Sequence, residues 1–467
     1  MPTVNGITGE TEMAFRRITI IAVAVLLGVA ILCAQTSEAN KVGRQGYDAM
    51  ERGDYSTGLT LLTKAAEAGD KEAQHHLGIY YLNGIGVPND DSKGFFWEKS
   101  SADQGFPPAQ YNVGVMYSIG KGVGRNLEKA FFWYSKSAEN GFVEAFVNLG
   151  ACYADGLGCE KNSEMAVSLY RKGVESGDPR AMTRLGVCYA DGQGCEKNSE
   201  KAVYWFRQGA EAGNARSMSN LAFCYANGQG CEQNNEKAVY WYRNGAEMGD
   251  SAAMFGLGYC YEKGHGCEQD YRKAVYWYRK SAEASDPTAM CNLGYCYENG
   301  LGCEQDFENA VYWYRKGAES GDPMAMAHLG YCYQNGQGCE QDYRKAVYWY
   351  RKSAEAGNHT AMCNLGYCYE EGHGGEQDYN KAVYWYRKSA DAGNPLAMNN
   401  LGCCYEKGHG CGQDYKKAVY WYKKGAEGGD STAMRNLGNC YEKGRGCEQD
   451  LKKAAYWKKR GTEASNR

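Results

Sequence analysis

The cysteines are the side chains in this sequence whose spacing points most directly to chemistry. The chain has 21 cysteines in 467 residues, and sixteen of them form eight pairs with six residues between the two members. The pairs are Cys152/Cys159, Cys188/Cys195, Cys224/Cys231, Cys260/Cys267, Cys296/Cys303, Cys332/Cys339, Cys404/Cys411 and Cys440/Cys447. This spacing is compatible with three interpretations: disulfide bonds, metal ligands or redox pairs.

Disulfide bonds within each pair are the reading that the surrounding residues favour. On an unbroken helix, residues seven apart lie about 10.5 Å apart along the axis, beyond the ~7 Å that a disulfide can bridge. Glycines four and six residues after the first cysteine break the helix, however, and let the chain fold back. Two early segments carry apolar residues at both places (Tyr80 with Val87, Met116 with Val123), which indicates that the two positions touch. We therefore predict eight disulfides, formed in an oxidising compartment; buried free cysteines are the alternative.

Zinc binding and redox activity have less support. Structural zinc sites use four ligands and Cys-x2–4-Cys spacing, and His265, His373 and His409 recur too rarely to complete them. No Cys-x-x-Cys redox pair occurs. We predict no metal and no cofactor.

Four further cysteines lie outside these pairs: Cys291, Cys363, Cys368 and Cys403. Cys368 has Gly375 where its partner would stand, and Cys403 is a candidate replacement. For Cys291 and Cys363, free thiols and bridges to another chain both stay open.

Composition and charge exclude several classes of protein. With 61 Gly but 8 Pro, the chain is neither collagen nor a Pro-rich disordered protein. Aromatic residues make up 13% of it, which argues against disorder. The formal charge of −4 lacks the basic excess that nucleic-acid binding needs, so we predict no nucleic-acid partner.

The N-terminus resembles an export signal. Residues 18–32 form an uncharged apolar run after Arg16 and Arg17, shorter than the roughly 20 residues of a membrane-spanning helix. Ser37 and Ala39 provide small residues for cleavage before Asn40. A cleaved signal, an uncleaved anchor and a lipid anchor on Cys33 stay open. All three predict export, to the periplasm or outside the cell (the secretory lumen in a eukaryote), with no membrane contact beyond this segment.

The rest of the chain repeats itself every 36 residues. Ala-Met-x-Asn-Leu-Gly begins at Ala289, Ala361, Ala397 and Ala433, and related segments extend the series to eleven units without insertion or deletion. We predict a signal segment over 1–39, a degenerate capping unit over 40–72, ten repeats over 73–432 and a capping repeat over 433–467. Such regular spacing is typical of repeat architectures.

Each unit reads as two amphipathic helices. In the unit from Ala289, apolar residues recur along one face of a helix until Gly300 and Gly302 stop it. Asp270 is placed to cap the second helix of the preceding unit, whose Trp and two Tyr we assign mostly to the core. Two such helices cannot bury their apolar faces alone, so we predict an all-α, right-handed α/α superhelical solenoid of about twelve units. Lys458 stands where other units have Tyr, as expected of a final capping repeat.

The repeated motif resembles the Sel1-like repeat, a relative of the tetratricopeptide repeat. The resemblance rests on Leu-Gly-x-x-Tyr-x-x-Gly-x-Gly followed by Asp-Tyr-x-Lys-Ala-x-x-Trp-Tyr, and it covers roughly residues 40–467. It implies a superhelical scaffold for protein–protein interaction or complex assembly. In the related fold the first helix of each unit lines the concave groove.

That resemblance assigns a partner-binding groove to the first helices. An aromatic ladder follows Leu-Gly in five consecutive units, an Asn row precedes Leu-Gly, and an acidic row begins three residues beyond the ladder. The predicted groove residues are Phe223, Tyr259, Tyr295, Tyr331, Tyr367, Asn220, Asn292, Asn364, Glu298 and Glu370. Aromatic and acidic side chains suit an extended peptide with basic residues, whereas simple packing between units is the alternative.

Enzyme activity has little support, and we predict no catalytic residues. Some cysteine-rich Sel1 proteins are described as β-lactam-binding or weakly hydrolysing, which makes this the alternative function. Ser118 and Lys121 form a Ser-x-x-Lys, but no Ser-Asp-Asn or Lys-Thr-Gly accompanies them.

Overall fold

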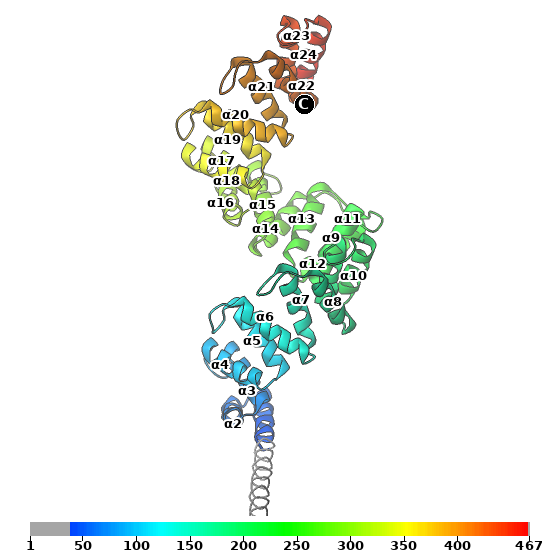
Figure 1. Cartoon of the computed structure of the whole chain (residues 1–467), viewed down its shortest axis with the longest axis vertical. Coiled ribbons are helices and arrows are strands. Elements are labelled where there is room, and N and C mark those ends of the chain that lie inside the picture. The colour runs from blue at the N-terminus through cyan, green and yellow to red at the C-terminus, as the bar shows by residue number, and fades with distance from the viewer. Residues whose placement is uncertain (1–37, 466–467) are drawn as a thin grey trace, which may run out of the picture. The chain divides into compact units, whose positions relative to one another are not determined.

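The described part of the chain consists of helices joined by short loops. The structure, a computed structural model, describes residues 38–465, in which no strand occurs (Figure 1). After a helical segment over 38–51, the helices are α2 Tyr55–Glu67, α3 Lys71–Asn83, α4 Asp91–Asp103, α5 Pro107–Ile119, α6 Leu127–Glu139, α7 Val143–Asp155, α8 Ser163–Glu175, α9 Pro179–Asp191, α10 Ser199–Glu211, α11 Ala215–Asn227, α12 Asn235–Glu247, α13 Ser251–Lys263, α14 Tyr271–Glu283, α15 Pro287–Asn299, α16 Phe307–Glu319, α17 Pro323–Asn335, α18 Tyr343–Glu355, α19 His359–Glu371, α20 Tyr379–Asp391, α21 Pro395–Lys407, α22 Tyr415–Glu427, α23 Ser431–Lys443 and α24 Leu451–Ser465. The all-α helix-turn-helix prediction is confirmed.

The helices alternate between two roles. We call the odd-numbered helices A helices and the even-numbered ones B helices. Within each unit an A helix packs against the B helix that follows it, and that B helix packs against the next A helix, from α2 to α10 in the first unit and from α12 to α24 in the second. This is the nearest-neighbour arrangement of a solenoid. A helices of neighbouring repeats also contact each other, as α15 does with α17.

The chain divides into two compact units. The first comprises the residues up to Ser217 together with Gln229–Cys231, and the second comprises Met218–Gly228 together with Glu232–Arg467. Both units are built from the same repeat.

The ends of the A helices are set by residues that the sequence identified. Asp286 caps α15 by accepting the backbone N–H of Ala289, and Gly300 ends that helix in the left-handed conformation, with φ 66°. Gly302, at φ 72°, packs against the backbone carbonyl of Tyr271 at the start of α14. The loop after each A helix therefore rests on the B helix of the preceding repeat, and only glycine leaves room for it.

The B helices begin at capped residues and bury one aromatic ring each. Asp270 caps α14 through the backbone N–H of Lys273, as predicted. The fully buried Tyr278 lies on the glycine of the Leu-Gly motif, since a Cβ added at Gly258 would meet its ring at 2.8 Å. The glycine of this motif is thus required for the close approach of a ring.

The prediction that most B-helix aromatics are core is only partly right. In α14, Tyr278 is buried and Trp277 is partly buried, but Tyr276 is 54% exposed. The reason is helical geometry, because Tyr276 projects about 200° around the axis from Tyr278. The same exposure recurs along the B helices at Tyr204, Tyr240, Tyr312, Tyr348, Tyr384, Tyr420 and Tyr456.

In the final repeat, a charged side chain takes the place of the buried aromatic ring. The stem of Lys458 lies over Gly438 where a ring lies elsewhere, and its ammonium forms an ion pair with Glu442 at 2.9 Å. This exposed pair puts charged groups where the other repeats have a buried ring.

Candidate functional site

The predicted aromatic ladder lies on the exposed face of the A helices. Its side chains are between 40% and 51% exposed, which is unusual for large aromatic groups in a folded chain. They project from α11, α13, α15, α17 and α19: Phe223, Tyr259, Tyr295, Tyr331 and Tyr367. Within the second unit α15 and α17 contact each other, which brings the helices that carry Tyr295 and Tyr331 side by side.

The predicted acidic residues already have partners within the chain. Glu298 accepts a hydrogen bond from the hydroxyl of Tyr314 at 2.6 Å, and Glu370 accepts one from Tyr386 at 2.7 Å. Both tyrosines are fully buried, and burial is the main reason that the pKa of Tyr314 is raised. The acidic row therefore satisfies buried hydroxyls besides contributing negative charge to the surface.

The predicted Asn residues are partly buried between repeats. Asn292, on α15, interacts with the hydroxyl of Tyr278 from the preceding B helix, and Asn364, on α19, interacts with that of Tyr350. Asn220, on α11, is partly buried as well. Internal contacts thus explain part of the Asn row, and binding of a peptide by these amides stays a prediction.

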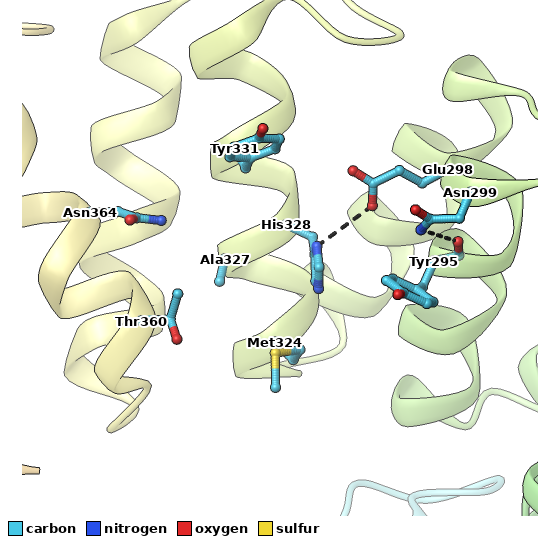
Figure 2. Close-up of a pocket in the computed structure, with 9 residues that line it drawn as sticks. All are labelled: Tyr295, Glu298, Asn299, Met324, Ala327, His328, Tyr331, Thr360 and Asn364. Atoms are coloured by element: carbon cyan, nitrogen blue, oxygen red, sulfur yellow. Dashed lines mark hydrogen bonds and ion pairs between the residues drawn. The ribbon is translucent and has the colours of Figure 1, made fainter. Parts of the chain in front are cut away.

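A hollow in the second unit brings predicted residues from three A helices together. It measures about 320 Å³ and lies between α15, α17 and α19. Figure 2 shows Tyr295 and Glu298 on one side, with His328 and Tyr331 of α17 facing the space. Glu298 and His328 lie 3.8 Å apart (Oε2 to Nδ1).

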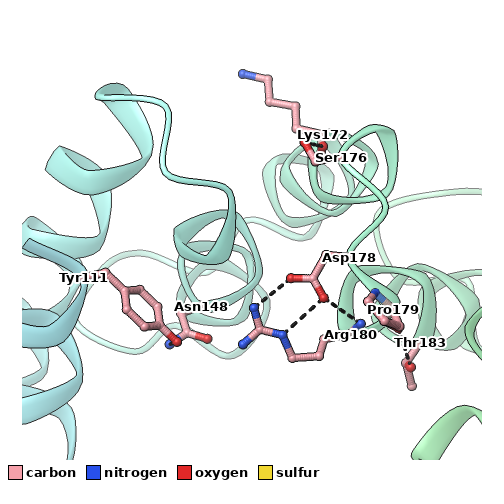
Figure 3. Close-up of polar contacts among 8 residues, drawn as sticks. All are labelled: Tyr111, Asn148, Lys172, Ser176, Asp178, Pro179, Arg180 and Thr183. Atoms are coloured by element: carbon pink, nitrogen blue, oxygen red, sulfur yellow. Dashed lines mark hydrogen bonds and ion pairs between the residues drawn. The ribbon is translucent and has the colours of Figure 1, made fainter. Parts of the chain in front are cut away.

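The A-helix surface of the first unit has a different polar cluster. Arg180, on α9, pairs with Asp178, its guanidinium lying 2.7 Å from the carboxylate. Figure 3 shows this guanidinium directed toward Tyr111 of α5 and Asn148 of α7. The hydrogen bond with Asp178 raises the pKa of Arg180, so this cluster keeps a positive charge on a surface without the aromatic ladder.

The predicted disulfides are not present in this structure. The cysteines of seven pairs are free thiols (Cys152/Cys159, Cys188/Cys195, Cys260/Cys267, Cys296/Cys303, Cys332/Cys339, Cys404/Cys411 and Cys440/Cys447), as are the additional Cys291, Cys363, Cys368 and Cys403. The eighth pair, Cys224 and Cys231, lies where the chain divides into its two units.

The arrangement of one pair shows which of its atoms lie close together. Cys296 projects into the core, whereas Cys303 lies half-buried in the following loop. The Cys303 thiol lies 3.6 Å from the carbonyl oxygen of Cys296, toward which it donates. Burial raises the pKa of Cys296 to about 12, and the thiolate that disulfide exchange requires is therefore disfavoured. The two residues are close, as the spacing indicated, but the contact joins the sulfur of Cys303 to the backbone carbonyl oxygen of Cys296.

No metal centre is evident in the described residues. Within residues 38–465, no group of three or more His, Cys, Asp or Glu side chains is arranged to hold a metal ion. Ser118 donates to the carbonyl of Val115, while the Lys121 ammonium contacts Asp91 and the carbonyl of Leu82. Ser118 and Lys121 are thus engaged with different partners.

The N-terminal signal prediction falls almost entirely outside the described residues. Among the helices that the structure describes, none has the length and apolar character needed to span a bilayer.

The repeats match a known family model over almost the whole chain. The model of the Sel1 repeat matches twelve successive segments: 39–70, 71–106, 107–142, 143–178, 179–214, 215–250, 251–286, 287–322, 323–358, 359–394, 395–430 and 431–466. The chain belongs to the Sel1 repeat family. The helix-turn-helix unit, the Leu-Gly motif and the capping glycines described above are those of its Sel1 repeats.

A solved structure of a similar protein agrees with this assignment. The crystal structure of c5321, a protective antigen present in uropathogenic Escherichia coli strains and displaying an SLR fold, is 34% identical with a TM-score of 0.63. The match covers 87% of this chain and 89% of that one. A Sel1 repeat protein from Oxalobacter formigenes is also 34% identical, over 52% of this chain and 96% of that chain, with a TM-score of 0.48. No match was found among curated protein sequences.

Two features of these Sel1 repeats were missed by the sequence analysis. The exposed Tyr row on the B helices was not singled out, although its place two residues after the buried Ala of each B helix was a signal for exposure. His328 was not among the predicted groove residues, yet it lines the hollow between α15, α17 and α19.

Proposed function

We propose that this Sel1 repeat chain is an exported scaffold that binds a partner protein through the A-helix surface of its second unit. Scaffolds of this fold are typically used for protein–protein interaction. The observation that carries the proposal is the row of five aromatic side chains left 40–51% exposed on successive A helices. Exposed aromatic side chains are enriched at protein interfaces, where they provide large contact areas.

The chemistry of this surface favours an extended, basic segment of the partner. Carboxylates such as Glu298 and Glu370 stand beside the aromatic row, whereas the first unit has Ala154 and Ala190 at the corresponding positions. Aromatic rings and carboxylates both attract ammonium and guanidinium groups. A row that recurs once per A helix suits an extended segment, because each repeat can contact a successive part of it.

The B-helix tyrosines provide a matched control for the test. A phage-displayed random peptide library is selected against the purified chain, and the affinities of the selected peptides are measured by fluorescence anisotropy. The variants are Tyr295→Ala/Tyr331→Ala on the A helices and Tyr348→Ala/Tyr384→Ala on the B helices. All four tyrosines are 44–53% exposed, so the two double variants remove similar surface from different faces.

We expect selected peptides rich in Lys and Arg that bind the A-helix variant at least tenfold more weakly and the B-helix variant unchanged. Equal losses in the two variants, or losses confined to the B-helix variant, would contradict the proposal.

Export is supported by the sequence alone, through the apolar run at 18–32 after Arg16 and Arg17. The similar protein c5321 is described as a protective antigen. Cell fractionation of the full chain beside a variant lacking residues 1–39 tests this part. We expect the full chain outside the cytosol and the truncated chain within it; cytosolic retention of both would refute export.

A further inference from the structure

His328 gives the hollow between α15, α17 and α19 an aromatic wall. Other repeats carry Asn at this position, for example Asn292 and Asn364. The His328 ring stacks on that of Tyr314, with 4.8 Å between ring centroids and 7° between planes. Its other neighbour is Tyr295, whose ring lies edge-on at 6.3 Å.

Three aromatic groups and a carboxylate surround the space. Tyr295 and Glu298 project from α15, and His328 and Tyr331 project from α17 (Figure 2). The Glu298 side chain is 16% exposed and that of His328 is 30% exposed, so both are reachable but largely shielded from water. Aromatic faces beside a shielded carboxylate form the kind of site that binds an organic cation.

The carboxylate of Glu298 differs from three of its equivalents in other repeats, whereas Glu370, like Glu298, accepts from a buried Tyr hydroxyl. Those three pair with a cation of the chain itself: Glu262 with Lys263, Glu406 with Arg445, and Glu442 with Lys458. In the described part of the chain, the partners recorded for Glu298 are the Tyr314 hydroxyl and the His328 ring. The site therefore has room and charge for a cation from elsewhere.

The surroundings of His328 keep its ring neutral near neutral pH. Burial lowers the pKa of His328 below its usual value, against the opposing charges of Glu298 and Asp322. Tyr295 and Tyr314 complete the titratable neighbours, and the α19 residues that line the hollow, Thr360 and Asn364, carry no charge.

We propose that this hollow binds the ammonium or guanidinium group of one lysine or arginine of the partner. The inference rests on the proposed function and narrows it to one anchoring site. The cation lies against the rings of Tyr295 and Tyr331 and compensates the charge of Glu298. Protonation of His328 places a second cation at the same carboxylate and releases the bound group.

A small probe tests the site without a protein partner. The chain contains 7 histidines, so its imidazole signals are few enough to resolve by NMR, and His328→Asn identifies the signal of interest. The probe is Nα-acetyl-lysine methylamide, and its uncharged isostere is the norleucine analogue. We expect the lysine compound to shift the His328 signal saturably in the millimolar range and the norleucine compound to bind at least tenfold more weakly. Equal binding of both, or no saturable shift, would overturn the proposal.

Variants at the carboxylate provide a matched pair. Glu298→Gln keeps an acceptor for Tyr314, since Gln334 accepts from Tyr350 at 3.0 Å in the next repeat. We expect it to weaken lysine binding at least tenfold. Glu406→Gln, at a carboxylate already paired with Arg445, leaves binding unchanged. If both variants bind like the original chain, the site does not recognise charge.

The dependence on pH separates this site from a generic acidic surface. Lysine affinity, measured by isothermal titration calorimetry, stays constant above about pH 6.5 and falls at lower pH as His328 takes up a proton. By linkage, saturating lysine lowers the pKa of His328 further. His328→Asn removes this decline. An unchanged decline in that variant would contradict the role of His328.

The outcomes distinguish this inference from the proposed function. If selected peptides depend on Tyr295 and Tyr331 but not on Glu298, the A-helix surface binds its partner without the cation site, and the inference fails alone. If the lysine compound depends on Glu298 while no selected peptide depends on the A-helix surface, the cation site stands and the proposed function fails.

Discussion

The α9/α10 repeat of the first unit and the α15/α16 repeat of the second share their packing but present different A-helix surfaces. In the first, the ring of Phe206 lies on Gly186, where an added Cβ would meet it at 2.6 Å. In the second, the ring of Tyr314 lies on Gly294 in the same way, at 2.7 Å. The contact of an aromatic ring with glycine is therefore what the hairpin needs, with or without a hydroxyl.

The polar groups distinguish the two repeats. Tyr314 donates to Glu298, whereas its counterpart Phe206 has no hydroxyl and Ala190 stands at the position of Glu298. The ladder position changes in parallel, from the partly buried Val187 to the exposed Tyr295. The difference teaches that the fold and the A-helix surface depend on separate sets of residues, so they can be perturbed separately.

The largest effect is expected where both repeats are the same. Gly194 and Gly302 both have positive φ and pack against backbone carbonyls, those of Ser163 and Tyr271. We expect alanine at either position to lower the free energy of unfolding by about 2–5 kcal/mol, through backbone strain and overpacking. Urea unfolding followed by circular dichroism measures it. Gly412→Ala, with open space around the glycine and no positive φ, is the control. If the loss of stability differs widely between the Gly194 and Gly302 variants, the conclusion that the two repeats pack in the same way is wrong.

Buried histidines give each unit its own response to acid. Burial, reinforced by the charge of His75, lowers the pKa of His76 in the first unit to about 4. Since the unfolded pKa is about 6.5, the unfolded state binds more protons between these values. We therefore expect stability to fall as the pH drops from 6.5 to 4, by up to about 2 kcal/mol after allowance for partial exposure.

The same sign applies to His328 in the second unit, whose pKa is also lowered chiefly by burial. Unfolding free energies measured across pH for His76→Gln and His328→Asn check both sites. We expect each substitution to remove the loss of stability at low pH in the unit that carries it, and to leave that of the other unit unchanged. Loss of stability on raising the pH instead would show that the histidines are charged in the folded state.

The Tyr314 hydroxyl tests whether the polar pair adds stability. Tyr314→Phe leaves Glu298 without its neutral donor and is expected to cost about 1–2 kcal/mol. In a Glu298→Ala background, which reproduces the Phe206/Ala190 arrangement of the first unit, the same substitution should cost less than about 0.5 kcal/mol. The double-mutant cycle measures the coupling directly. A coupling near zero would show that Glu298 acts only at the surface.

The smallest effect concerns a single turn in the second unit. Ser285 has φ 68° and is the one non-glycine residue with positive φ among the residues described, at a turn where other repeats have glycines such as Gly249 and Gly321. Ser285→Gly relieves this strain, and we expect a gain of about 0.5–1 kcal/mol. Gly321→Ser should show the reverse change in thermal unfolding. If neither substitution changes the midpoint of thermal unfolding, the turn tolerates serine and glycine equally.

The repeat spacing made much of the fold predictable. The glycines that end helices and the Asp that begin them act within one turn of the chain, so their effect was readable from local sequence. Gly300 and Asp270 stand where they were expected, and the exposure of Tyr295 and Tyr331 agrees with what the resemblance to the tetratricopeptide fold implied.

The contacts between helices were harder to predict from the sequence. Cys303 was expected to reach the Cys296 sulfur, but the thiol meets the carbonyl oxygen of that residue instead. Spacing determines that two residues are near each other, whereas side-chain direction decides which atoms meet. The exposure of Tyr276 was not predicted for a related reason, since a strongly aromatic helix does not by itself show which ring faces away from its neighbours.

The sequence by itself determined the 36-residue period, the two helices of each repeat and the residues on each helical face, because these depend on interactions between residues close in the chain. Only the tertiary structure decided that Glu298 binds the Tyr314 hydroxyl and that His328 stacks on the same ring. Those contacts join helices of the same and of successive repeats, and they depend on how far apart packed helices lie and how their side chains turn.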